Sequence, residues 1–207
     1  MKVKICGITC LEDALAAVEA GADALGFNFA EEAKAKGRYI DPDDARNIVE
    51  QLPDTVLSVA VTVNEGPARL REYLEFVDRV QLHGEETPEM CREFGAQAIK
   101  AFRVGPDFTP ERMQEYSVGA YLLDAFVPEQ RGGTGTTCDW ETARRARELG
   151  MPLVLAGGLT PENVAEAVRA VEPCAVDTAG GVESGPGKKD HERVRSFIHN
   201  AKASLSG

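Results

Sequence analysis

The chain has 207 residues, with 34 acidic against 23 basic side chains and a formal net charge of −11. Hydrophobic residues make up 43% and charged residues 28% of the sequence, a globular balance that excludes a wholly disordered chain. The acidic balance argues against nucleic acid and against an anionic membrane surface as partners.

Short apolar runs alternate with amphipathic segments of helical length along the whole chain. Eight of these runs predict β-strands: Val3–Cys6, Ala24–Phe29, Leu57–Val63, Arg79–Leu82, Ala98–Val104, Ala120–Asp124, Pro152–Ala156 and Ala175–Thr178. Four helices are predicted to begin where a capping residue precedes proline, at Asp41-Pro42, Thr87-Pro88, Thr109-Pro110 and Thr160-Pro161. Thr9 is expected to cap a further helix at Leu11–Glu19, with Glu12 completing a capping box.

Strand–helix units that repeat eight times predict a parallel sheet. At 207 residues, this α/β repeat fits a single-domain (β/α)₈ TIM barrel over residues 1–207 better than the alternative, an open doubly wound sheet. The segment Ala30–Ile40, between the second strand and the second helix, is charged and contains Gly37. We therefore expect a loop there, of the kind that moves over an active site.

The expected compartment follows from three absences in the sequence. No apolar run is as long as the roughly 18 residues that mark a membrane-spanning helix. The first residues lead directly into a strand, so no secretory leader is expected. Five scattered cysteines are typical of reduced thiols rather than a disulfide framework. We expect a cytoplasmic protein with no membrane contact, whose acidity reflects either a salty cytoplasm or an ordinary acidic surface.

Candidate catalytic residues stand at the ends of two predicted strands. Chemistry in such barrels lies at the C-terminal ends of the strands. Strand alternation puts Lys4 and Cys6 on the axial side and Val3 on the other, so Cys6 ends the first strand near the open mouth. Asp124 ends an apolar run, where an unpaired carboxylate is costly to bury. The two form a candidate acid/base pair, although a buried thiol and a loop-capping carboxylate are the structural alternatives.

Glycine-rich turns close the seventh and eighth units, at Gly157-Gly158 and Gly180-Gly181. Glycine lets backbone amides approach an anion closely, and the loops after strands seven and eight are the usual phosphate site of a barrel. The pair of turns therefore predicts a phosphate-binding site, with plain tight turns as the alternative.

These motifs together resemble one family, the phosphoribosylanthranilate isomerases of tryptophan biosynthesis. The segments that carry the resemblance run in the family's order: Lys4–Thr9 (KICGIT), Gly21–Phe27, Val80–Glu85 (VQLHGE), Leu122–Asp124, Gly132–Gly135, Asp139-Trp140, Ala156–Val164, Gly181–Glu183 and Pro186–Asp190. The resemblance implies an Amadori rearrangement of N-(5′-phosphoribosyl)anthranilate to 1-(2-carboxyphenylamino)-1-deoxyribulose 5-phosphate.

The resemblance also implies a role for each matching residue. Cys6 matches the general base and Asp124 the general acid, and Arg38 matches the arginine that meets the anthranilate carboxylate. His83 and Asp177 match residues of the substrate pocket. The phosphate-binding positions are Gly157, Gly158, Gly180 and Gly181. Two departures from the family pattern concern affinity rather than reaction class: Lys36 stands in place of a serine, and Ala179-Gly180 in place of serines.

The implied chemistry makes demands on both catalytic side chains. Asp124 has to hold a proton for the departing ring oxygen, so we expect burial to raise its pKa above the ordinary value of about 3.9. Cys6 has to act as a thiolate, so its pKa, ordinarily about 8.5, has to be lowered or coupled to the cationic Schiff base of the substrate. No metal or organic cofactor is expected, because the nitrogen of the substrate serves as the electron sink.

Three other functions fit the same barrel. A Schiff-base aldolase-like enzyme would use Lys4 or Lys100, if either points inward. A non-catalytic barrel would bind a phosphosugar without turnover, which the presence of Cys6 and Asp124 argues against. A dual-substrate aminoaldose isomerase would use paired aspartates, and Cys6 stands where the first would be. The expected partner is a small phosphosugar, and the chain is expected to be a monomer or a homodimer.

Overall fold

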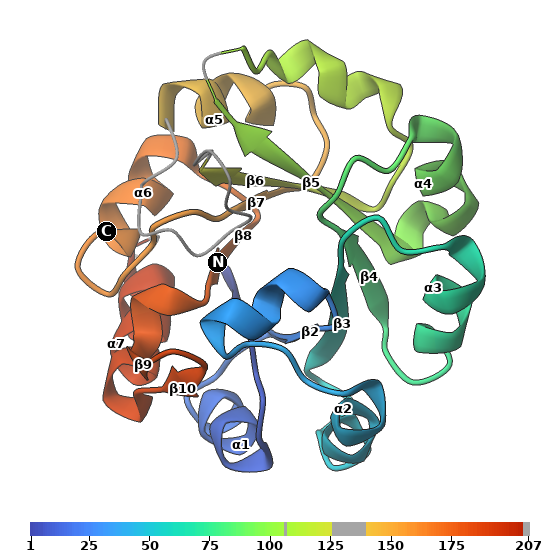
Figure 1. The fold of residues 1–207 in the computed structure, drawn as a ribbon. Helices are drawn as coiled ribbons and strands as arrows, with labels where there is room; N and C mark the ends of the chain where they lie inside the picture. The colour runs from blue at the N-terminus through green and yellow to red at the C-terminus, as the bar shows by residue number, and fades with distance from the viewer. Residues whose placement is uncertain (106, 126–139, 205–207) are drawn as a thin grey trace.

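Eight parallel strands close into a barrel, which confirms the predicted (β/α)₈ fold (Figure 1). The computed structural model describes residues 1–105, 107–125 and 140–204. The barrel strands follow one another in chain order: β1 (Lys2–Cys6), β2 (Ala24–Asn28), β3 (Leu57–Thr62), β4 (Arg79–Leu82), β5 (Ala98–Val104), β6 (Ala120–Ala125), β7 (Leu153–Leu155) and β8 (Ala175–Thr178). β8 pairs with β1 and closes the barrel, with Lys4 opposite Asp177. The open doubly wound sheet is therefore excluded.

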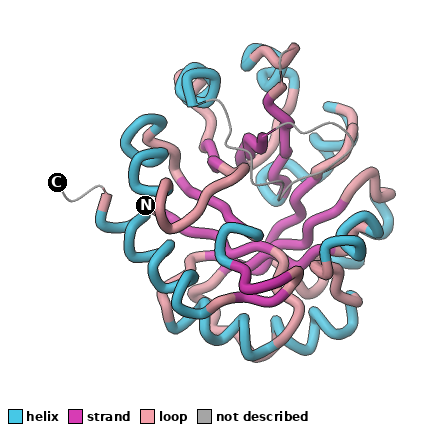
Figure 2. Tube along the Cα trace, turned by 60° about the vertical axis from the view of Figure 1, so that its left-hand side comes forward, coloured by secondary structure: helices cyan, strands magenta, loops and turns pink. Residues whose placement is uncertain are grey.

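Helices surround the barrel on its outer face (Figure 2). The α-helices are α1 (Leu11–Glu19), α2 (Pro42–Val49), α3 (Pro67–Tyr73), α4 (Pro88–Phe94), α5 (Trp140–Arg147), α6 (Val164–Val171) and α7 (His191–Ala203). Shorter 3₁₀ helices are η1 (Glu31–Lys36), η2 (Gly95–Gln97), η3 (Pro110–Glu115) and η4 (Gly180–Val182), and a small hairpin joins β9 (Glu183–Gly185) to β10 (Lys188–Lys189). None of the helices in the described ranges is long and apolar enough to cross a membrane.

Two predicted helix caps are confirmed and one is wrong. Asp41 accepts a hydrogen bond from the amide of Asp43 at 3.0 Å, and Thr87 accepts one from the amide of Met90 at 3.3 Å. Thr9 does not cap α1, because Cys10 occupies the cap position and makes no capping hydrogen bond through its side chain. The Thr9 hydroxyl instead donates to the carbonyl oxygen of Gly187, at 3.1 Å, and so ties the first loop to the last hairpin.

The remaining two caps are only partly right. Thr109-Pro110 begins a 3₁₀ helix, η3, rather than an α-helix. After Thr160-Pro161 the chain first makes a turn, and α6 begins at Val164 with Asn163 in the cap position. The Thr160 hydroxyl accepts from the amide of Glu162 at 3.2 Å, which stabilises that turn.

Strand alternation divides the core into two parts. Outward side chains such as Val3 and Ile5 pack with the helices in one large apolar cluster. Inside the barrel, a small apolar cluster lies on β5 to β7 and consists of Ala101, Leu122, Val154 and Ala156. The interior also holds buried polar and charged side chains, among them Lys4, Gln81 and Asp177. The predicted inward direction of Lys4 and Cys6 is confirmed. Both side chains fill the space on the inner face of Gly26, where an added Cβ would lie 3.0 Å from Lys4 Nζ and 2.8 Å from Cys6 Sγ.

The segment Ala30–Ile40 was expected to be a loop, and that expectation is wrong for its middle. Six of its residues form η1, which lies over the barrel mouth in Figure 1. Lys34 pairs with Glu31 one turn away, at 2.7 Å, and such a pair stabilises a short helix. Gly37 then ends the helix in the left-handed conformation, with φ of 62°.

Candidate active site

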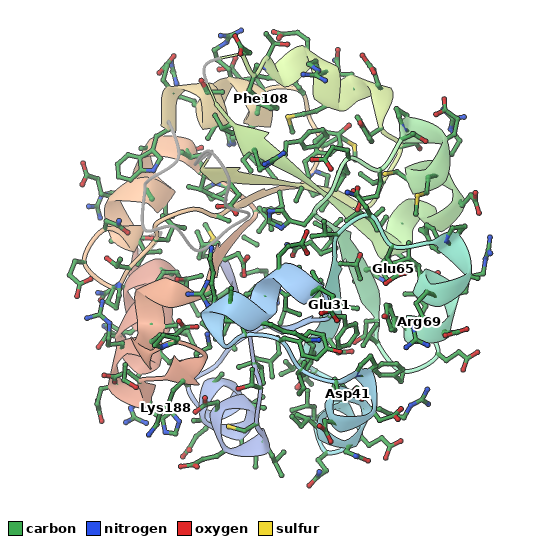
Figure 3. The ribbon with its side chains drawn as sticks, viewed as in Figure 1. Glu31, Asp41, Glu65, Arg69, Phe108 and Lys188 are labelled. Atoms are coloured by element: carbon green, nitrogen blue, oxygen red, sulfur yellow. The ribbon has the colours of Figure 1, made fainter. Side chains whose placement is uncertain are left out.

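A cavity of about 630 Å³ opens at the carboxyl ends of the strands. It brings together every site residue predicted from the sequence: Cys6, Arg38, His83, Asp124, Gly157, Gly158, Asp177, Gly180 and Gly181. Asp41, Arg69 and Lys188, labelled in Figure 3, lie around the outer parts of the molecule instead. The cavity is therefore the candidate active site.

Cys6 ends β1 and is buried in the cavity wall, with 8% of its surface exposed. Gly26, its neighbour on β2, leaves the room for this side chain, because a Cβ there would lie 2.8 Å from Cys6 Sγ and 3.0 Å from Lys4 Nζ. Burial raises the pKa of the Cys6 thiol by more than the ammonium of Lys4 lowers it. Of the two alternatives for Cys6, a lowered pKa or coupling to the cationic Schiff base of the substrate, burial in the ligand-free protein argues against the first.

Lys4 pairs with Asp177 inside the barrel, with Nζ 3.0 Å from Oδ1 and both side chains buried. Burial disfavours the charged amine, but the Asp177 carboxylate and the Cys6 sulfur outweigh it, so the pKa of Lys4 is raised. An amine that keeps its proton is not a nucleophile. The geometry thus argues against a Schiff-base role for Lys4.

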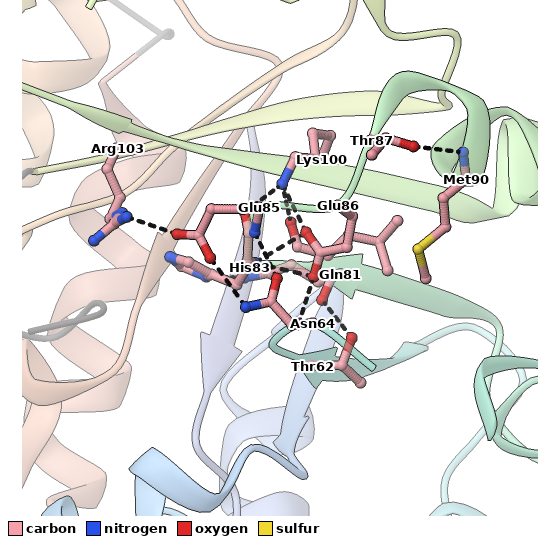
Figure 4. A network of polar contacts seen from close by, with 12 residues as sticks. Thr62, Asn64, Gln81, His83, Glu85, Glu86, Thr87, Met90, Lys100 and Arg103 are labelled. Atoms are coloured by element: carbon pink, nitrogen blue, oxygen red, sulfur yellow. Dashed lines mark hydrogen bonds and ion pairs between the residues drawn. The ribbon is translucent and has the colours of Figure 1, made fainter. Parts of the chain in front are cut away.

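Lys100 was considered as an inward-pointing lysine, and that interpretation is wrong. Its neighbour Ala101 lies inside the barrel, so Lys100 faces outward with Phe102, whose ring centre is 5.8 Å from Nζ. The ammonium donates to the carbonyl oxygens of Leu82 (3.2 Å) and Gly84 (2.7 Å) and pairs with Glu86 at 2.7 Å (Figure 4). Lys100 therefore braces the loop after β4 and has no access to the cavity.

Asp124 ends the sixth strand's inward-facing row and is buried beside His83, with His83 Nε2 3.4 Å from Asp124 Oδ2. The other ring nitrogen of His83, Nδ1, lies 3.0 Å from the side-chain amide nitrogen of Gln81, Nε2. When this side-chain amide donates to Nδ1, the ring proton of the neutral imidazole is on Nε2, the nitrogen that faces Asp124. The imidazole therefore lies beside the carboxyl group of Asp124.

Arg38 follows η1 and reaches the rim of the cavity. Its guanidinium makes two hydrogen bonds to the carboxylate of Glu183, from Nε and from Nη2, each 2.8 Å long. Glu183 also accepts from Lys189 Nζ at 2.9 Å. Burial acts to raise the pKa of Glu183, but the two cations outweigh it and lower that pKa. Lys36, the departure from the family pattern, lies in the cavity wall close to this cluster.

Four backbone amides line one end of the cavity, those of Gly157, Gly158, Gly180 and Gly181. None of these N–H groups donates a hydrogen bond within the described part of the chain. Gly157 and Gly158 have φ of 86° and 63°, a backbone that favours glycine. Asn163 holds this turn by donating to the Gly158 carbonyl at 2.9 Å. Free amides gathered from two loops are an anion-binding arrangement.

Gly181 also serves packing, since a Cβ there would collide with the carbonyl oxygen of Leu159 in the neighbouring loop. Arg193, on α7, donates to the Gly181 carbonyl from Nε (3.1 Å) and Nη2 (3.0 Å). It brings a cation to the same end of the cavity. At this end the missing serine hydroxyls are not replaced by Thr178, whose hydroxyl is bonded to the Leu159 carbonyl at 2.8 Å.

Sequence reasoning missed three residues of the cavity, namely Gln81, Glu183 and Arg193, as well as Lys189, which pairs with Glu183 behind the cavity wall. Gln81 could have been found, because it lies two positions before His83 and therefore on the same side of the chain. The pairing of Glu183 with Arg38 had no local signal, because 145 positions separate the two residues.

No group of three or more His, Cys, Asp and Glu side chains in residues 1–105, 107–125 and 140–204 is placed to hold a metal ion. The expectation of a reaction without a cofactor stays a prediction from the chemistry of the substrate. The described cysteines, Cys6, Cys10, Cys91 and Cys174, are free thiols, while Cys138 and the motif Gly132–Gly135 lie outside the described residues.

A closed (β/α)₈ barrel with its cavity at the carboxyl ends of the strands defines the class of TIM-barrel enzymes. The family described as N-(5′-phosphoribosyl)anthranilate (PRA) isomerase matches residues 3–200. N-(5′-phosphoribosyl)anthranilate isomerase of Geobacter metallireducens is 51% identical over 205 residues, which cover 98% of this chain and 100% of that protein.

Two solved structures extend the similarity to the fold. Phosphoribosylanthranilate isomerase of Thermus thermophilus matches with a TM-score of 0.88 at 40% identity, over 99% of this chain and 100% of that one. A phosphoribosylanthranilate isomerase in complex with reduced 1-(o-carboxyphenylamino)-1-deoxyribulose 5-phosphate matches with a TM-score of 0.82 at 43% identity, over 98% and 99%.

The chain belongs to the phosphoribosylanthranilate isomerase family. Its reaction is the isomerisation of N-(5′-phosphoribosyl)anthranilate in tryptophan biosynthesis. The barrel and the reaction predicted from the sequence are thereby confirmed, and the aldolase-like and non-catalytic alternatives are set aside. The roles of the individual site residues stay predictions.

Proposed function

We propose that this chain rearranges N-(5′-phosphoribosyl)anthranilate with Cys6 as the general base and Asp124 as the general acid. One observation carries the proposal. Cys6 on β1 and Asp124 on β6 enter the same cavity from strands with two others between them on one side of the barrel and four on the other. A small substrate in that cavity lies between a thiol and a carboxyl group.

The first step is opening of the furanose ring. Asp124 gives its proton to the ring oxygen, the bond between that oxygen and C1′ breaks, and the nitrogen lone pair forms the cationic Schiff base. His83 holds the carboxyl group of Asp124 toward the substrate during this transfer, since its Nε2 lies 3.4 Å from Oδ2. The step needs no electrophile beyond the proton, because the nitrogen of the substrate accepts the positive charge.

The second step is removal of the proton at C2′. The Schiff base acidifies this proton, Cys6 takes it as a thiolate, and the C–H electron pair forms the enolamine double bond. The raised pKa of Cys6 describes the ligand-free protein. A cation formed beside the sulfur favours the thiolate, so the substrate itself activates the base. The enolamine then gains a proton at C1′ and loses its hydroxyl proton, which gives the ketone.

Binding is divided between the two ends of the cavity. Arg38 meets the anthranilate carboxylate, and the amides of Gly157, Gly158, Gly180 and Gly181 take the phosphate, with the cation of Arg193 beside them. The Lys4–Asp177 pair lies beneath Cys6 and presents a buried, balanced charge pair to the sugar. Fixed amides can hold an anion in a protein of net charge −11, where long-range attraction does not favour it.

The chain acts as a monomer or a homodimer. Support for the homodimer comes from a structure of monomers generated from dimeric phosphoribosylanthranilate isomerase of Thermotoga maritima, whose chain is 42% identical with a TM-score of 0.83. Sedimentation equilibrium of the purified protein distinguishes the two states by mass.

An isomerase assay with substrate generated in situ tests the proposal, with loss of the anthranilate-type fluorescence as the readout. Deleting a general base or acid typically costs about 10²–10⁴-fold in rate, so Cys6→Ala and Asp124→Asn should each lose at least that much of kcat. The substituted proteins should still bind a reduced product analogue. Near-normal turnover by either variant removes that residue from its role. The histidine-pathway aminoaldose in the same assay tests the dual-substrate alternative, and competitive inhibition by inorganic phosphate tests the anion site.

A further inference from the structure

Three charged side chains form a buried cluster at the rim of the cavity: Arg38, Glu183 and Lys189. Their side chains are 11%, 6% and 0% exposed. The proton transfers described above use neither Glu183 nor Lys189. The cost of removing charges from water offsets much of the attraction between them, so a buried ion pair adds little to stability. The cluster therefore calls for an explanation other than stability.

The geometry of the guanidinium shows what Glu183 leaves available. A guanidinium presents five N–H donors in one plane, as a side fork from Nε and Nη2 and an end fork from Nη1 and Nη2. Glu183 occupies the side fork of Arg38 with its two 2.8 Å hydrogen bonds. Nη1 makes no hydrogen bond to any residue that the structure describes. The end fork, which matches a second carboxylate, is therefore not used by the described protein.

The charges of the cluster point to the same kind of ligand. One carboxylate, Glu183, stands between two cations, Arg38 and Lys189, so the cluster carries one excess positive charge. The Lys189 ammonium donates to Oε1 of Glu183, the oxygen that also accepts from Arg38 Nε, and to the carbonyl oxygen of Ala179 at 3.3 Å. Of the two cations, Arg38 lines the cavity, so a ligand carboxylate there would neutralise the excess positive charge.

The backbone of the two loops fixes the cluster in place before a ligand arrives. A Cβ on Gly37, next to Arg38, would lie 2.9 Å from the carbonyl oxygen of Pro186, and one on Gly187 would collide with the carbonyl oxygen of Gly37. The loop that carries Arg38 therefore packs directly on the β9–β10 hairpin that carries Glu183 and Lys189. Thr9 secures the hairpin from the other side through the Gly187 carbonyl, at 3.1 Å.

We propose that Glu183 is a positioning residue that sets the preference for a carboxylated aromatic substrate by holding Arg38 with its end fork toward the cavity. The inference rests on the proposed function, since it takes Arg38 as the partner of the anthranilate carboxylate. Glu183 touches no reacting atom. It preorients a planar donor pair, and Lys189 allows its carboxylate to stay ionised at this depth.

Substitution of Glu183 with two product analogues tests the role. Calorimetry compares a reduced product analogue that has the carboxylate with one in which a phenyl group replaces the carboxyphenyl group. A charged hydrogen-bond pair held in place is worth about 10- to 100-fold in affinity, so Glu183→Gln should weaken the carboxylated analogue by that factor and leave the phenyl analogue unchanged. KM should rise by a similar factor with kcat nearly unchanged. Equal weakening of both analogues, or a loss in kcat alone, overturns the proposal.

Two further proteins separate this role from a structural one. In an Arg38→Ala background, Glu183→Gln should cause no additional loss for the carboxylated analogue, whereas an additive loss overturns the proposal. If Glu183→Gln fails to fold with Lys189 unpaired, the double variant with Lys189→Met removes both charges, and it should show the same selective loss.

Glu111→Gln is the matched control, since Glu111 forms an exposed ion pair with Arg145 and should keep the parental KM. The analogue measurements need no turnover. If the parental chain binds the carboxylated analogue but does not convert the substrate, the acid–base assignment is contradicted. The role of Glu183 is still tested in that case, by the binding of the two analogues.

Discussion

Two lysines are buried on strands of this barrel, and each is paired with one carboxylate. Lys4 faces the barrel axis, 3.0 Å from Asp177 and next to Cys6. Lys100 faces the helices, 2.7 Å from Glu86, and holds the carbonyl oxygens of the loop after β4. Their side chains are 5% and 3% exposed, so burial does not distinguish them. The two lysines differ in the face of the strand from which they project.

The difference shows that the face of the strand decides what a buried ion pair does. On the axial side, the Lys4 ammonium acts on the sulfur of Cys6, the proposed general base. On the outer side, the Lys100–Glu86 pair is linked by Glu86 to the backbone amides of Asn64 and Gly84, and it sets the path of the loop that follows His83 (Figure 4). The same substitution in both lysines should separate the two tasks.

The largest expected effect is the loss of stability that the two substitutions share. Lys4→Met and Lys100→Met each leave a carboxylate buried without its cation. Removing one partner of a buried pair costs about 3–5 kcal/mol, and we expect a loss of this size in the free energy of unfolding for both variants. Urea unfolding monitored by circular dichroism measures it. A loss below about 1 kcal/mol at either site, the usual value for exposed pairs, would show that the pair is not held in a dry interior.

The next effect concerns the space that Gly26 leaves on the axial side. In Gly26→Ala the new methyl group would lie 2.8 Å from Cys6 Sγ, so the sulfur has to move. A displacement of about 1 Å at a catalytic group costs on the order of 10²-fold, and we expect a loss of this order in kcat. Steady-state kinetics measure it. Gly66→Ala, where a Cβ meets open space, is the control and should retain the parental kcat.

Much of this comparison was accessible from the sequence. Apolar runs located all eight strands, because strands buried on both faces read as continuous apolar stretches. Alternation along β1 placed Lys4 and Cys6 on the axis. Alternation along β5 also predicts that Lys100 faces outward if its neighbour Ala101 faces inward. The sequence does not show that Ala101, like Leu122 on β6, faces the interior. A short strand with apolar residues on both faces does not reveal which face is inside.

The remaining features depend on contacts that no local pattern encodes. The sequence left two alternatives for the Cys6 thiol, a lowered pKa or coupling to the cation of the substrate, because the balance between burial and Lys4 depends on the depth of the site. Thr9 matches a capping pattern, yet its hydroxyl is bonded to Gly187, 178 positions away. The pairing of Arg38 with Glu183 likewise requires the loops after β2 and β8 to be neighbours, which follows only from closure of the barrel.

A smaller effect, on pH dependence, should appear on the axial side alone. If the Cys6 thiolate is the base, as proposed, kcat/KM should rise with pH through the pKa of Cys6 in the free protein, which lies above the ordinary thiol value. Lys4 lowers that pKa, and Asp177 raises it. Lys4→Met removes the lowering and leaves the raising, so the rising limb should move to higher pH. Lys100→Met should leave the limb in place. A limb that moves equally in both variants, or in neither, contradicts the coupling of Lys4 to Cys6.

The smallest effect concerns the surface charges, which salt screens more strongly than it screens the two buried pairs. Exposed pairs such as Arg144–Glu141, with side chains 53% and 65% exposed, are screened, as is the repulsion among the acidic groups behind the net charge of −11. The Debye length falls from about 10 Å at 0.1 M to 3 Å at 1 M salt, while buried pairs are screened much less. If the acidic surface reflects a salty cytoplasm, the melting temperature should rise between low and molar KCl, by about 2–4 °C for each kcal/mol of repulsion removed. Activity should persist in molar salt, because the proposed phosphate site consists of backbone amides rather than surface charges. Scanning calorimetry and the isomerase assay over the same KCl series decide the matter, and an unchanged melting temperature with full activity in dilute buffer identifies an ordinary acidic surface.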